Sequence, residues 1–213
     1  MKSFGLTIVK SHRGDTWQIF ALSEDSCYTI SSQKISEVFI LNRIATFEKV
    51  GFSQFRIDAE QCKVPLATDK LLAVYEAIAL PQRATAGSAG YDFHSPLSFA
   101  LASRETITIP TGIRVAIEPG WWLGLLPRSG HGFQYRIQLD NTLGVIDSDY
   151  YYADNEGHIL IKLTNDSHSS TQLSLAAGDR FAQGIFLPYG ITTDDQAQGV
   201  RRGGFGSTGK GGV

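Results

Sequence analysis

The residues from about Ile107 onward form short apolar stretches, and most of these stretches end at Gly, Pro or Asp. In ETITIP, HILIKL and TQLSL, apolar side chains alternate with polar ones, and GIRVAI has Ile113, Val115 and Ile117 at alternate positions. Alternation with a period of two puts every second side chain on one face of a strand. A turn at Pro119 and Gly120 leads into WWLGLLP, and FAQGIFLP follows a break at AAGD. Short strands at this spacing predict an all-β barrel or double sheet.

Helical periodicity is limited to two segments. ATDKLLAVYEAIA spaces Leu71, Val74 and Ile78 as on one face of a helix, although a strand ending before Pro81 is an alternative. GFSQFRIDA is expected to be a short helix capped by Ser53. The first 43 residues are Ser-rich and of mixed periodicity, which indicates an extension or a small appended unit.

Composition excludes several functional classes. The formal net charge is −2 and the pI is about 6.2, so no general basic field would attract nucleic acid. Cys27 and Cys62 are the only cysteines, which excludes a Cys-rich zinc site and favours two reduced thiols. The N-terminal apolar run is too short for a signal peptide, and no apolar stretch approaches ~20 residues. We therefore expect a soluble, cytoplasmic protein without a membrane span.

The sequence closes on GGFGSTGKGGV, in which Gly204 to Lys210 reads G-x-x-x-x-G-K. A P-loop needs a helix after the lysine and a Ser or Thr to hold magnesium, whereas only GGV follows here. A disordered Gly-rich tail is the plain alternative. Against it, Arg201, Arg202 and Lys210 are cationic and Phe205 is aromatic, which suits an arm that stacks on a base and binds phosphates.

The densest polar stretch runs from Asp140 to His158. Asp147 and Asp149 fit the start of an EF-hand calcium loop, but the later ligand positions do not. Asp147 follows the apolar residues 144–146, which places a carboxylate at the mouth of a buried strand, suited to taking a proton from water. Ser129 lies near His131 without a hydrolase elbow motif. The five histidines lack metal-ligand spacing and are expected at the surface.

Five stretches in order are more specific than any one alone: SAGYDF, PRSG, GVIDSDY, GDRFAQ and GGFGSTGK. Together they resemble the five motifs of the trimeric dUTP nucleotidohydrolase (dUTPase) family. The resemblance covers residues 84–210 and extends more loosely back to Ile44, as in Gram-positive bacterial or phage-type members. It implies a distorted jelly-roll (β-clip) barrel with few short helices, assembled as a homotrimer whose sites lie between subunits. It divides the chain into an extension of unknown role (1–43), a barrel (44–200) and a closing arm (201–213).

The resemblance also implies hydrolysis of dUTP to dUMP and pyrophosphate with Mg²⁺, which limits uracil incorporation into DNA. Asp147 matches the base that activates water and is expected to be an unpaired carboxylate, while Asp92 and Gln183 match residues that hold the metal through water. Tyr150 matches the aromatic that packs on deoxyribose and leaves no room for a 2′-hydroxyl, and Phe205 of the arm is expected to stack on uracil. The full set of substrate-binding residues implied is Arg128, Ser129, Gly130, Asn141, Gly144, Val145, Ile146, Tyr150, Gln183, Arg201, Phe205, Gly206, Ser207 and Thr208.

Some positions depart from the family pattern, and competing functions stay open. Either Arg201 or Arg202 could supply the phosphate cation, with Arg201 preferred. The stretch YYADNE at 151–156 is an insertion that we expect to lengthen a hairpin near the sugar site. A dCTP deaminase of the same fold needs a Glu where this chain has Lys162. Two competing functions are a regulatory protein-binding module on a dUTPase-like shell and a less selective triphosphate pyrophosphatase.

Overall fold

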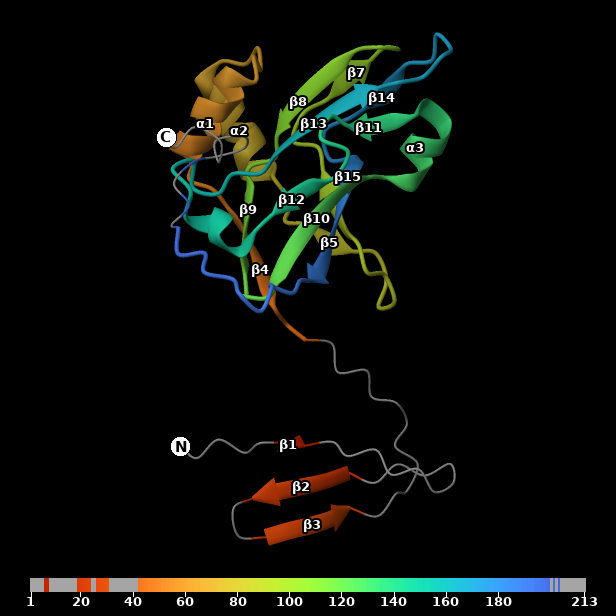
Figure 1. Ribbon diagram of the computed structural model, residues 1–213. Coiled ribbons are helices and arrows are strands. Elements are labelled where there is room, and N and C mark those ends of the chain that lie inside the picture. Colours follow the sequence, from red (N-terminus) through yellow and green to blue (C-terminus); the bar gives the residue numbers. More distant parts are fainter. Residues whose placement is uncertain are drawn as a thin grey trace. The chain divides into compact units, whose positions relative to one another are not determined.

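A computed structural model describes residues 42–199, 201 and 203, together with three strands nearer the N-terminus. The chain divides into two compact units, residues 1–43 and 44–213 (Figure 1). The described part of the first unit is an antiparallel sheet of order β1-β2-β3, with strands Leu6–Thr7, Ile19–Ser23 and Ser26–Ile30.

The second unit is built on a five-stranded antiparallel sheet of order β12-β10-β15-β6-β5. Its long central strands are β10 (Trp121–Pro127) and β15 (Arg180–Pro188), which pair from Trp121 opposite Pro188 to Pro127 opposite Ala182. The flanking strands are β12 (Gly144–Ile146), β6 (Tyr91–His94) and β5 (Gln82–Arg83). Five of the predicted site residues lie in this sheet: Asp92, Gly144, Val145, Ile146 and Gln183.

Three smaller antiparallel sheets complete the barrel in the described part of this unit. Their orders are β11-β13-β8, β14-β7 and β4-β9. The strands are β4 (Ala45–Lys49), β7 (Phe99–Leu101), β8 (Thr106–Pro110), β9 (Ile113–Ile117), β11 (Ile137–Leu139), β13 (Leu160–Asn165) and β14 (Leu173–Leu175). The predicted β-rich fold with few short helices is thereby confirmed.

The apolar periodicity explains which faces are buried. In β9 the burial alternates strictly, with Ile113, Val115 and Ile117 inside, and in β13 Ile161 and Leu163 point inward while Lys162 is exposed. Burying such side chains contributes about 1.5–3 kcal/mol each. Strand β4 was not predicted from its sequence, although Phe47 packs against the core by ring contacts with Tyr91 and Phe93.

Among the described residues, four helical segments accompany the sheets: α1 (Phe52–Gln61), α2 (Thr68–Ala77), α3 (Ser129–Tyr135) and the 3₁₀ helix η1 (Ser148–Tyr152). The segment ending before Pro81 is thus a helix, not a strand. The predicted cap of α1 is wrong, because Gly51 is the N-cap residue and Ser53 lies within the first turn. None of the helices described is long and apolar enough to cross a membrane.

Candidate functional site

Strand β10 organises the site because it pairs with two strands that carry predicted functional residues. Along one edge, Leu123 lies opposite Ile146 and Leu125 opposite Gly144, so β12 ends beside the N-terminal half of β10. Along the other edge, Leu126 lies opposite Gln183 of β15. If this register is continued by one residue, Asp147 lies opposite Trp122, which is four residues before Leu126. Because a strand rises ~3.4 Å per residue, Asp147 and Gln183 are about 14 Å apart along β10.

One cluster, which we call the Asp92 cluster, consists of Asp92, Arg128, Arg180 and Gln183. Asp92 and Gln183 are direct Cα partners in the β6–β15 ladder. The Asp92 carboxylate lies 3.3 Å from Nε of Arg128 and 3.3 Å from Nη1 of Arg180. The Gln183 amide donates to the carbonyl of Pro127 at 3.2 Å, which leaves its Oε1 as an acceptor. Arg180 was not predicted from the sequence to belong to the site.

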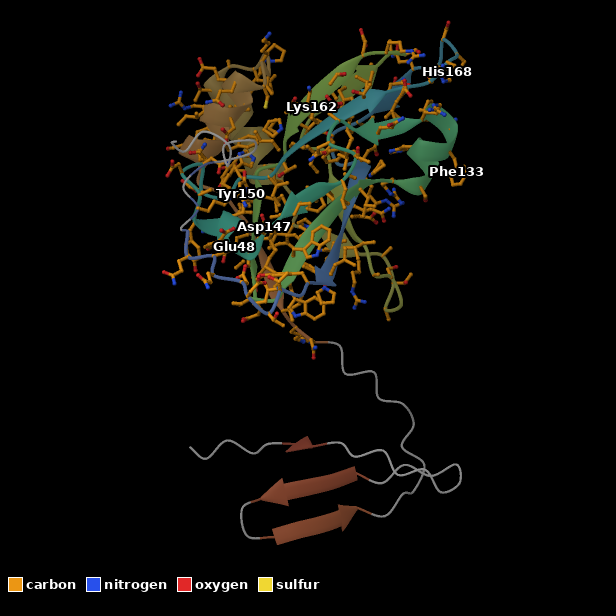
Figure 2. The ribbon with its side chains drawn as sticks, viewed as in Figure 1. Glu48, Phe133, Asp147, Tyr150, Lys162 and His168 are labelled. Carbon is orange, nitrogen blue, oxygen red and sulfur yellow. The ribbon has the colours of Figure 1, made fainter. Side chains whose placement is uncertain are left out.

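Helix α3 extends this cluster, because Arg128 is its N-cap residue and Ser129 and Gly130 begin it. A hollow of about 260 Å³ lies against Pro127, Arg128, Ser129 and Phe133. Phe133 is 93% exposed, and Figure 2 shows it far from Asp147 on the barrel. His131, for which the sequence indicated no role, is half-buried, and burial and the Arg128 guanidinium lower its pKa. The imidazole is therefore neutral near pH 7.

The second cluster, which we call the Asp147 cluster, consists of Asp147, Asp149, Tyr150 and Arg201. Asp147 follows β12 and is the N-cap residue of η1. Its carboxylate lies 2.7 Å from Nη1 of Arg201, and Asp149 lies 3.5 Å from the same nitrogen. The expectation of an unpaired carboxylate is therefore wrong for this structure. The side chain of Asp147 nevertheless remains 52% exposed, which leaves an oxygen accessible to water.

Tyr150 is the buried member of the Asp147 cluster. The Arg201 guanidinium carbon lies 4.9 Å from the centre of its ring, a cation–π arrangement. The tyrosine is only 1% exposed, and its hydroxyl donates to the carbonyl of His158 at 2.8 Å while accepting from Asn155 at 2.9 Å. Burial raises the pKa of Tyr150, so the phenol stays protonated and donates.

The residues expected to recognise uracil lie on either side of the turn into β12. Asn141 is exposed in the turn after β11, and its carbonyl accepts from the amide of Leu143 at 2.6 Å. In β12, Gly144 and Ile146 are buried, whereas Val145 is 45% exposed and lines a hollow of about 230 Å³ with Trp122, Asp147 and Tyr189. Phe205, Gly206, Ser207 and Thr208, like the alternative cation Arg202, lie outside the described residues.

The insertion at 151–156 does not lengthen a hairpin. Instead, residues 148–152 form η1, and turns then lead to His158 and β13. The loop from Asp147 to His158 closes tightly because Gly157 has a φ of +69°. A Cβ there would lie 2.7 Å from the carbonyl oxygen of Tyr150.

Sequence reasoning missed a buried acid–base pair. His158 is 0% exposed and Asp58 is 4% exposed, and Nδ1 of the histidine lies 2.6 Å from the Asp58 carboxylate. The expectation that every histidine lies at the surface is therefore wrong for His158. In the sequence, His158 stands at the end of a polar loop, two residues before β13. A histidine at such a position is not expected to be buried, so no local pattern could have predicted the pair.

The fold and the two clusters define a class of protein, a β-sheet protein with a site for an anionic ligand. Its guanidinium groups can bind the anion, and its carboxylates can accept a proton from a water molecule. A family model for dUTPase matches residues 76–210. The deoxyuridine 5'-triphosphate nucleotidohydrolase of Lactococcus lactis is 37% identical over 135 residues, which are 62% of this chain and 89% of that protein. The chain belongs to the dUTPase family.

Two solved structures are also similar to the chain. The dUTPase of Streptococcus mutans is 35% identical, covering 53% of this chain and 88% of that one, with a TM-score of 0.48. A mutant dUTPase from phage phi11 of S. aureus, whose structure reveals the coordination of a structural Mg(II) ion, is 22% identical, covering 57% of this chain and 90% of that one, with a TM-score of 0.46. Family membership rests on the family model and the sequence relative.

Proposed function

We propose that the chain is a dUTP diphosphatase that hydrolyses dUTP to dUMP and pyrophosphate. The main support for the proposal is Asp147, a half-exposed carboxylate directly after Ile146, the buried last residue of β12, and beside Tyr150 and Arg201. Such a group can take a proton from one ordered water. Family membership supplies the substrate class, since the relatives matched are named as deoxyuridine triphosphate nucleotidohydrolases.

In the proposed reaction, water attacks the α-phosphorus of dUTP. The water oxygen forms a bond to that phosphorus while the bond to the oxygen bridging the α- and β-phosphorus breaks, and pyrophosphate leaves. Asp147 accepts the proton of the attacking water. For this to happen Arg201 has to exchange the Asp147 carboxylate for a phosphate oxygen, which it can do because both are charge-assisted partners of similar kind.

The Asp92 cluster is proposed to bind the triphosphate. Arg128 and Ser129 present a guanidinium and a hydroxyl beside the hollow at the start of α3, and Arg180 adds a second cation. Positive charge fixed at this position stabilises the negative charge that develops on the leaving pyrophosphate. The substrate anion would thus meet two guanidinium groups that are otherwise shared with Asp92.

The residues present fit a magnesium ion held through water. Within the described part of the chain, no group of three or more His, Cys, Asp or Glu side chains could enclose a metal. Asp92 and Oε1 of Gln183 are instead two neighbouring acceptors for metal-bound water. Mg²⁺ keeps several waters and binds phosphates, so when bound it would neutralise charge on the triphosphate.

We propose further that one active site combines the Asp92 cluster of one subunit with the Asp147 cluster of another, in a homotrimer. The separation of the two clusters along β10 supports this, because Asp147 and Arg128 face different hollows of one chain. Mixing Asp147→Asn and Arg128→Ala subunits by joint refolding tests it. Partial recovery of activity in the mixture is expected, whereas two inactive parents that stay inactive together would place both clusters of a site in one subunit.

Two features favour dUTP hydrolysis over deamination of dCTP. Lys162, which stands where the deaminase needs a glutamate, is 56% exposed, and its ammonium lies 2.6 Å from Asp140. Figure 2 shows Lys162 well apart from Asp147 and Tyr150. An ammonium bound to a carboxylate cannot shuttle protons to a base amino group.

The proposed function is tested by following pyrophosphate release from dUTP, dCTP, dTTP and UTP with Mg²⁺. We expect turnover of dUTP alone, with no ammonia released from dCTP. Comparable turnover of all four nucleotides would instead indicate an unselective pyrophosphatase. Binding of dUTP without pyrophosphate release would indicate a binding module.

A further inference from the structure

Residues 44–62 precede the part of the chain matched by the family model, yet they contact the loop that carries the proposed base and Tyr150. That loop runs from Asp147 through η1 to His158. We call it the η1 loop. Three separate interactions join it to β4, to the residue before α1, and to α1 itself.

The first two interactions lie near the surface. Tyr151 donates its hydroxyl to Glu48 of β4 at 2.8 Å, and Arg114 binds the same carboxylate at 2.8 Å while lying 4.4 Å from the centre of the Tyr151 ring. The backbone amide of Gly51 donates to Glu156 at 2.7 Å. Figure 2 shows Glu48, Asp147 and Tyr150 on the same side of the barrel in this view. Exposed contacts of this kind contribute little individually.

The third interaction is the buried pair of Asp58 and His158. The backbone amide of Gly112 donates to Nε2 of His158 at 2.8 Å, so that nitrogen carries no proton. The ring proton is therefore on Nδ1 and is donated to Asp58. Gln54, one turn earlier in α1, donates to the same carboxylate oxygen at 2.8 Å. The imidazole is thus held in one tautomer and orientation from both sides.

This histidine in turn fixes Tyr150, because the Tyr150 hydroxyl donates to the carbonyl oxygen of His158. Asn155 donates to both that carbonyl and the Tyr150 hydroxyl, at 3.2 and 2.9 Å. A movement of His158 would therefore move the acceptor on which Tyr150 is oriented. We propose that Asp58 is a positioning residue that acts through His158 to hold Tyr150. Because the Tyr150 ring is expected to pack on deoxyribose and exclude a 2′-hydroxyl, this positioning would determine discrimination between deoxyribose and ribose.

The discrimination part of this inference rests on the proposed function, whereas the positioning part does not. Replacing Asp58 by Ala leaves the buried Nδ1–H of His158 without its acceptor, and the ring cannot switch tautomer without losing Gly112. Asp58→Asn keeps an oxygen that accepts from His158 and is the conservative rescue. Glu60→Ala changes an exposed residue of the same helix, and Leu71→Ala destabilises neighbouring helix α2 without removing a hydrogen bond of the pair.

Two measurements on the full-length chain test the inference. Hydrogen exchange should become faster over residues 148–158 in Asp58→Ala but not over β15, and Asp58→Asn should restore protection. The ratio of kcat/KM for dUTP to that for UTP should fall about tenfold in Asp58→Ala and be unchanged in Glu60→Ala and Leu71→Ala.

Unchanged exchange in the η1 loop of Asp58→Ala would overturn the positioning role, whether or not the wild type turns over dUTP. An equal fall of the ratio in Leu71→Ala would overturn the link to discrimination, because general destabilisation would then explain it. A wild type without dUTP turnover would refute the proposed function, and hydrogen exchange would still decide the positioning role.

Discussion

Gly157 closes the η1 loop, and replacing it with alanine should destabilise the protein more than the same change at a matched turn glycine. Its φ of +69° costs an L-residue about 1–2 kcal/mol. The added Cβ would also lie 2.7 Å from the Tyr150 carbonyl oxygen and 2.8 Å from the Tyr151 Cα. Both are backbone atoms that cannot rotate away, so overpacking adds about 1–3 kcal/mol. The expected total loss is about 2–5 kcal/mol.

Gly178 is the matched control, because its φ of +89° is also positive but nothing lies within 4 Å of an added Cβ. Gly178→Ala should therefore lose only the backbone cost of about 1–2 kcal/mol. Urea unfolding followed by tryptophan fluorescence, at one protein concentration for all variants, measures both losses. Losses within about 0.5 kcal/mol of each other would refute the reasoning that the η1 loop packs tightly at Gly157.

Three further predictions concern single side chains. Burial and the Asp58 carboxylate raise the pKa of Cys62 from 9.0 to about 11, so less of the thiol is present as the reactive thiolate. Iodoacetamide at pH 8 should therefore modify Cys62 roughly tenfold more slowly in the folded protein than in urea. Equal rates would contradict this. In Gly90→Ala the added Cβ would lie 2.8 Å from Oε1 of Gln183 and displace this acceptor of metal-bound water, so the Mg²⁺ concentration for half-maximal activity should rise. Gly87→Ala is the control and should leave it unchanged, because nothing lies within 4 Å of a Cβ at that position. Arg201→Ala removes the preferred phosphate contact and should raise KM for dUTP about 10- to 100-fold, whereas Arg202→Ala should change KM little. A larger rise in KM for Arg202→Ala than for Arg201→Ala would assign the phosphate contact to Arg202.

The strands of the barrel could be predicted because each buries one face of a regular apolar alternation. Ile113, Val115 and Ile117 are an example, and all three are buried as their spacing indicates. Strand β4 could not be predicted because Glu48 and Lys49 are adjacent polar residues, which interrupt the apolar alternation typical of a strand. All five of its residues nevertheless pair with β9. The cap of α1 was missed because glycine, which has no side chain to signal it, occupies the N-cap position.

The candidate site was only partly predictable for a different reason. Motif residues such as Asp92 and Gln183 are recognisable individually, and the β6–β15 register then brings them together. The Asp58–His158 pair joins residues 100 positions apart, and neither has a neighbour in the sequence that indicates the other. The contact of Arg201 with Asp147 likewise depends on where the chain returns after β15, which local patterns do not encode.

The most direct test of the account is pyrophosphate release from dUTP by the wild type and by Asp147→Asn, with dUTP binding measured for both. The substitution keeps the size of the side chain and removes its ability to accept the proton of water. We predict that Asp147→Asn binds dUTP but loses at least about 10²-fold in kcat. Wild-type kcat in Asp147→Asn would contradict the central claim that this carboxylate activates the attacking water.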